Sequence, residues 1–140
     1  MLNIHSWWAY LTVLFILIAT FNAASGLISK RVFKDKDLRL ALFALIVSHI
    51  QMVIGLGVYF SSPAYKLLKE NGMSGLDTYA RLLAVEHPLM MLLAIVCITV
   101  GWSKHKKKTD DNAKFKTIAL FYGLGLIFVL SRIPWATWFN

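Results

Sequence analysis

The side chains best suited to chemistry in this chain are histidines that stand in or beside long apolar runs. His49 lies within ALFALIVSHIQMVIGLGVYF, and His87 within RLLAVEHPLMMLLAIVCITV. His5 precedes the apolar run that starts near Trp7. An ionisable side chain is costly in hydrocarbon and usually has a function there. Neutral imidazole is a common metal ligand, and facing helices of a bundle can clamp a flat cofactor between two of them. We therefore expect His49 and His87 to ligate the iron of one haem b.

Estimates of depth favour this pair and leave one alternative open. At 1.5 Å per residue, His49 falls near the bilayer midplane and His87 about 5–7 Å further out. Each Nδ1–H can bond the carbonyl one turn earlier, on Leu45 or Leu83, which leaves Nε2 for iron. His5 falls about 8 Å outside His87, so depth alone also allows a His5–His87 pair or a second site at His5. An interhelical hydrogen bond is the ordinary role of a lone membrane histidine.

Charged and soft side chains surround the third apolar run. We expect Arg132 to reach the depth of His87 and Arg81 to lie at the outer end of this run. Guanidinium groups bind carboxylates in bidentate fashion, so both arginines are predicted to hold haem propionates. The alternative is a structural ion pair between Arg132 and Glu86. Met91, one turn after His87, is predicted to pack on the haem, and Pro88 to kink the helix.

Four apolar runs must position these side chains. With 58% hydrophobic and 16% charged residues, a chain of 140 residues cannot hide its apolar surface as a soluble domain. A membrane-spanning helix needs about 20 mostly apolar residues. The predicted spans are roughly 7–28, 39–60, 80–102 and 117–138. Because their connections are short, the sequence predicts an all-α, up-down four-helix membrane bundle as one domain over 1–140. Asn22 and Gln51 are expected to form interhelical hydrogen bonds.

The basic residues are concentrated in two connections, SKRVFKDKDLR and SKHKKKTDDNAKFK. The positive-inside rule places both connections in the cytoplasm and both termini outside. The formal charge of +8 is thus explained by membrane orientation, and nucleic acid is not an expected partner. His105, in the second basic connection, is expected to be solvated. The longest connection contains PAYKLLKENG, whose spacing favours a short interfacial helix over a mobile loop.

Several short motifs resemble a group of small bacterial four-span membrane proteins labelled cytochrome b-like. The matching pieces are HSWW, SHIQMVIGLGVYF, VEHPLMMLLAI and RIPW. The resemblance implies a haem b protein of the bacterial inner membrane with His49 and His87 as ligands. A more distant similarity is to one half of haem A synthase, a four-helix membrane unit that uses histidine pairs and an acidic residue.

Three functions follow from these patterns. The first is electron transfer by one haem b held between the second and third spans, with a quinone or a respiratory complex as partner. The second is an enzyme that modifies haem or quinone, with Glu86 carrying protons. The third is a cofactor-free assembly or scaffold subunit. Membrane lipid is an expected partner in each case, and a second copy of the chain is an alternative to a respiratory complex as the protein partner. The single cysteine, Cys97, excludes an internal disulfide and any CxxC motif.

Overall fold

The computed structural model describes residues 1–139, and its regular structure there is helical without a strand. Four helical stretches are long and apolar enough to cross a membrane. They are α1 (Leu2–Ser29), α2 (Asp35–Ser61), the continuous stretch Thr78–Lys106, which ends in α5 (His87–Lys106), and α6 (Asp111–Ser131). The expected all-α fold with four long apolar helices is confirmed.

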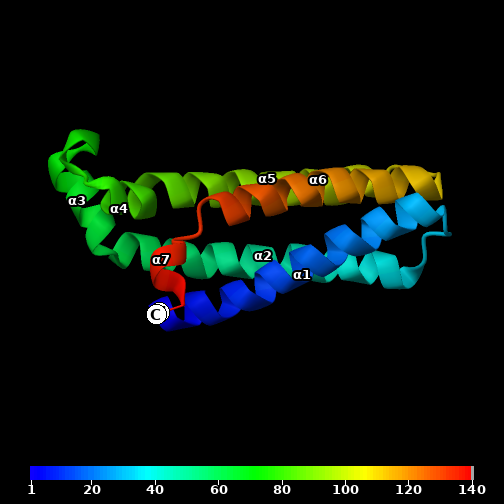
Figure 1. Cartoon of the computed structure of the whole chain (residues 1–140), viewed down its shortest axis with the longest axis horizontal. Helices are drawn as coiled ribbons and strands as arrows, with labels where there is room; N and C mark the ends of the chain where they lie inside the picture. Colours follow the sequence, from blue (N-terminus) through cyan, green and yellow to red (C-terminus); the bar gives the residue numbers. More distant parts are fainter. Residues whose placement is uncertain (140) are drawn as a thin grey trace.

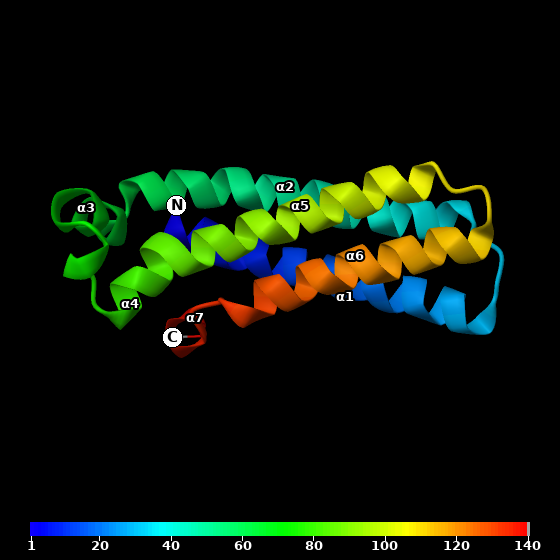
Figure 2. The same ribbon diagram turned by 90° about the horizontal axis from the view of Figure 1, so that it is seen from above.

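The four long helices pack as an antiparallel bundle (Figures 1 and 2). α1 lies against α2 and α6, while α5 lies against α6 and α2, so α1 and α5 face each other diagonally. The two short turns, 30–34 and 107–110, share one end of the bundle. The N-terminus, the short helix α7 (Trp135–Trp138) and the connection between α2 and α5 lie toward the other end.

The tightest packing occupies the half of the bundle next to the two short turns. Small and large apolar side chains are buried together there: Ala23 and Ala41 are 1% exposed, and Phe115 and Tyr122 are fully buried. The Tyr122 hydroxyl donates to the Ala41 carbonyl at 2.8 Å, which is possible because small side chains let the helices approach closely. The half near the termini instead contains His5 and His87.

A buried polar network fixes the turn between α1 and α2. Asp37 is 2% exposed, and its carboxylate accepts hydrogen bonds from Asn22 at 2.7 Å and from Arg31 at 2.9 Å. The bond with Asp37 raises the pKa of the Arg31 guanidinium above its ordinary value, so this side chain stays charged. Asn22 therefore forms the expected interhelical hydrogen bond.

The other basic connection differs from the prediction. α5 continues to Lys106, and His105 in its last turn is only 1% exposed. Its Nδ1–H donates to the Trp102 carbonyl at 2.6 Å, and its ring lies against Trp102 and Phe33. The expectation of a solvated His105 was wrong, because an extra helical turn directs this residue inward.

The fourth span also ends earlier than expected. α6 stops at Ser131 and not at 138, and Arg132 caps it. Pro134 lacks an amide hydrogen and disfavours helical geometry in the residue before it, so the helix cannot continue through this segment. Arg132 therefore sits at a helix end, with its backbone carbonyl available for other partners.

The connection between α2 and α5 contains the expected short helix. α3 (Pro63–Asn71) begins after Ser62, whose hydroxyl accepts from the Tyr65 amide at 3.1 Å, and ends at Gly72 with φ 70°. A 3₁₀ turn, η1 (Met73–Gly75), and a short helix, α4 (Thr78–Arg81), lead to a π-helical turn, η2 (Leu82–Glu86), just before α5.

The π-helical turn is stabilised by a side chain from α2. Pro88 has no N–H to donate to the Ala84 carbonyl, and the Tyr59 hydroxyl donates to that carbonyl instead, at 3.0 Å. Because π-turns often occur at functional sites, the π-helical turn directly before His87 marks this end of the bundle as the candidate location of a functional site.

Candidate functional site

Two histidines from diagonally opposed helices meet in the half of the bundle near the termini. The ring centroids of His5 in α1 and His87 in α5 are 6.2 Å apart, with the ring planes at 82°. Both side chains are half-buried. Of the histidine pairings considered from the sequence, this is the one that the structure brings together.

His49 lies elsewhere, on an exposed part of α2. Its Nε2 is 3.3 Å from the Thr99 hydroxyl oxygen. Thr99 follows His87 by twelve residues, which is about 18 Å along α5. Two nitrogens that ligate one metal ion are only about 4 Å apart. The predicted pairing of His49 with His87 on one iron is therefore wrong for this structure.

The register between α2 and α5 explains the error. Tyr59 contacts Ala84 and His49 contacts Thr99, so His87 is level with the part of α2 that lies beyond His49 toward the termini. The predicted depths of His49 and His87 hold only if the two apolar runs are centred at the same height. The observed stagger of α2 against α5 separates the two histidines by more than the predicted distance of about 5–7 Å.

A helix end holds His87 in place. Its Nδ1–H donates to the Arg132 carbonyl at 2.8 Å, so the acceptor comes from the end of α6 and not from Leu83 as predicted. This bond fixes the neutral tautomer that carries its lone pair on Nε2, and no hydrogen bond engages Nε2 within residues 1–139. For His49 the predicted bond to Leu45 is confirmed, at 2.8 Å.

His5 is held by its backbone and faces a glycine. Gln51 in α2 donates to the His5 carbonyl at 3.0 Å, which confirms the interhelical bond expected for Gln51. A Cβ added to Gly55 would stand 3.1 Å from Cε1 and 3.5 Å from Nδ1 of the His5 ring. The His5 Nδ1 is buried without a hydrogen-bond partner in the described chain. The absence of a side chain at Gly55 therefore makes room for an imidazole whose nitrogens remain available.

A charged cluster lies directly beside His87 in the chain. Glu86 Oε2 is 3.1 Å from Arg132 Nε, and Glu86 Oε1 is 3.3 Å from Arg81 Nε. The ion pair that the sequence offered as an alternative is thus observed, and Arg81 joins it. Glu86 and His87 both contact Arg132: Glu86 pairs with the Arg132 guanidinium, and His87 donates to the Arg132 backbone carbonyl. Two guanidinium groups share one carboxylate, so one positive charge remains for a further anion.

Met91 lies one turn beyond His87 on α5 and is partly buried against the apolar core. Its predicted contact with a cofactor remains a prediction.

The separation of the two imidazoles bears on whether they could share one metal ion. The atoms of a five-membered ring with bonds near 1.33 Å lie about 1.1 Å from its centre. With metal–nitrogen bonds of about 2 Å, two imidazoles in line on one ion have centroids about 6 Å apart. The observed 6.2 Å is compatible with this arrangement, and equally with a direct edge-to-face contact of the two rings. Among the described residues there is no group of three or more His, Cys, Asp and Glu that could hold a bare ion. A donor set of two imidazoles therefore suits an ion whose other ligands come from a porphyrin.

No family model, curated protein or solved structure matches this chain.

Proposed function

We propose that this chain is a membrane b-type cytochrome in which His5 of α1 and His87 of α5 ligate one haem b. The observation that carries the proposal is the pair of half-buried imidazoles 6.2 Å apart on opposed helices. When held by two histidines, a haem would supply one-electron transfer. The proposed activity is therefore electron transfer, and not chemistry on a ligand bound to iron.

The chain's own residues set the properties of the site. The Arg132 carbonyl orients His87 and increases the basicity of its Nε2. Arg81 and Arg132 both point a guanidinium at Glu86, and their remaining N–H groups suit the propionates of the haem. The Glu86 carboxylate limits the positive charge near the metal and so keeps the reduced state from being over-stabilised.

The location of the site suggests its partner. With both basic turns in the cytoplasm, as the positive-inside rule directs, the histidine pair lies toward the outer face of a bacterial inner membrane. Both termini then lie outside. A quinone or a respiratory complex reaching that face is the proposed electron partner.

The test is a reduced-minus-oxidised absorption spectrum of the detergent-purified chain, with haem quantified as its pyridine complex. One haem b per chain with a low-spin b-type band is the expected result. A folded protein that remains colourless after expression with ample haem would refute the proposal and favour the cofactor-free scaffold. Two haems per chain would require a second site, for which His49 is the candidate.

A further inference from the structure

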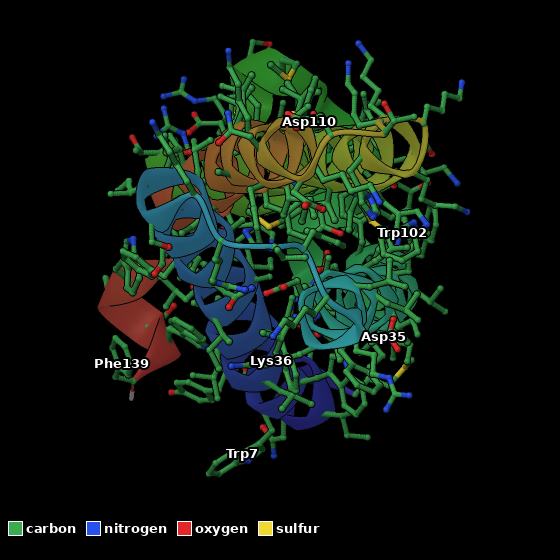
Figure 3. The ribbon with its side chains drawn as sticks, turned by 90° about the vertical axis from the view of Figure 1, so that its right-hand side faces the viewer. Trp7, Asp35, Lys36, Trp102, Asp110 and Phe139 are labelled. Carbon is green, nitrogen blue, oxygen red and sulfur yellow. The ribbon has the colours of Figure 1, made fainter. Side chains whose placement is uncertain are left out.

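Two adjoining grooves lie at the start of α2, at the end of the bundle opposite the histidine pair. Figure 3 views the molecule from this end and labels Asp35 and Lys36. One has a volume of about 500 Å³ and the other about 470 Å³, and they share Lys36. The first is lined by Asn22, Ser25, Arg31, Val32, Lys34 and Lys36. The second is lined by Asp35, Lys36, Arg39, Leu40 and Phe43.

The cations of these grooves differ in how they are used. Arg31 is engaged by the buried Asp37. Neither the Lys36 ammonium nor the Arg39 guanidinium has a hydrogen bond or an ion pair with any described residue. Asp35 contributes one carboxylate to the second groove, so the two free cations still leave that groove with a net positive charge. This surface is complementary to an anion.

The second groove changes from charged to apolar along one face of α2. Lys36, Arg39, Leu40 and Phe43 follow at spacings of three, one and three residues, which places them on one side of the helix. Phe43 is 48% exposed and lies about 10 Å deeper than Lys36. The polar zone of one membrane leaflet is about 5–8 Å thick, so this distance leads from the headgroups into hydrocarbon.

We propose that the second groove binds an anionic phospholipid. Its phosphate lies between Lys36 and Arg39, and an acyl chain runs over Leu40 and Phe43. A free phosphate would use the cations but gain nothing from the apolar wall, so the combination selects a lipid. The site is independent of haem, because it lies at the opposite end of the bundle from His5 and His87.

The test is native mass spectrometry of the detergent-purified chain titrated with phosphatidylglycerol, with phosphatidylcholine of the same acyl chains, and with inorganic phosphate. The double variant Lys36→Gln/Arg39→Gln is compared with Lys66→Gln/Lys69→Gln, which removes the same charge from α3 at the other end. Phosphatidylglycerol should bind in preference to phosphatidylcholine. The groove variant should weaken its binding about tenfold or more, and the α3 variant should not.

Three results would overturn the proposal. Equal binding of the two lipids would show that charge does not select the ligand. Equal losses in the two double variants would show that only net charge matters. Inorganic phosphate that displaces phosphatidylglycerol at comparable concentration would show that the apolar wall contributes nothing. Both double variants change exposed side chains, so circular dichroism should show an unchanged helical content.

Discussion

Replacement of Gly55 by alanine tests the geometry around His5 most finely. The added Cβ would stand 3.1 Å from His5 Cε1, whereas ordinary van der Waals contact begins near 3.4 Å. The imidazole must therefore withdraw by about 0.3 Å, which exceeds the tolerance of about 0.2 Å in a metal–ligand distance. Overpacking of this kind typically costs about 1–3 kcal/mol. If the histidine pair holds haem, affinity should fall about 5- to 140-fold.

The matched control is Gly123→Ala in α6. There a Cβ would lie 3.6 Å from the Thr20 methyl carbon, which is an ordinary contact. Both changes raise helix propensity by about 1 kcal/mol, so global stability does not separate them. The assay is the rate of haem transfer from each variant to an excess of a haem-scavenging apoprotein. Faster loss from Gly55→Ala alone is expected. Equal rates in the two variants would refute the placement of His5 beside the metal.

The contacts support three further predictions. Tyr59→Phe removes the hydroxyl that donates to the Ala84 carbonyl, to which Pro88 has no N–H to donate, so thermal unfolding in detergent should show a loss of about 1–3 kcal/mol. Tyr79→Phe, which removes an exposed hydroxyl contact, should cost less than about 0.5 kcal/mol, and equal losses would contradict the role given to Tyr59. Asp37→Asn breaks a buried charged network and should cost about 1.5–3 kcal/mol by the same unfolding assay, whereas an unchanged midpoint would show that the network adds no stability. Glu86→Gln removes a negative charge beside the proposed haem and should raise its midpoint potential in a redox titration; a lower potential would argue against this placement.

The number and type of elements could be predicted from the sequence because each span is a long apolar run bounded by charges. The polar residues inside those runs were also informative. Asn22 and Gln51 both bond across helices, as expected for polar groups in hydrocarbon. The ion pair between Glu86 and Arg132 was available as an alternative from their estimated depths.

The histidine pairing could not be predicted, for a physical reason. In these spans apolar residues cover both the lipid-facing and the core-facing sides, so periodicity does not reveal how each helix is rotated. Nor does local sequence fix the stagger of antiparallel helices, which here places His49 beside Thr99 and far from His87. Pro134 did carry a usable signal: it ends α6 early and frees the Arg132 carbonyl that anchors His87.

The most direct test of the central claim is the haem content per chain of three single variants, purified in parallel and quantified as the pyridine complex. His5→Ala and His87→Ala should each lose the low-spin haem, because each removes one of the two imidazoles that meet at 6.2 Å. His49→Ala should keep a full complement, because His49 faces Thr99 about 18 Å away along α5. Loss of haem in His49→Ala with retention in His5→Ala would contradict the assignment and restore the pairing suggested by the sequence.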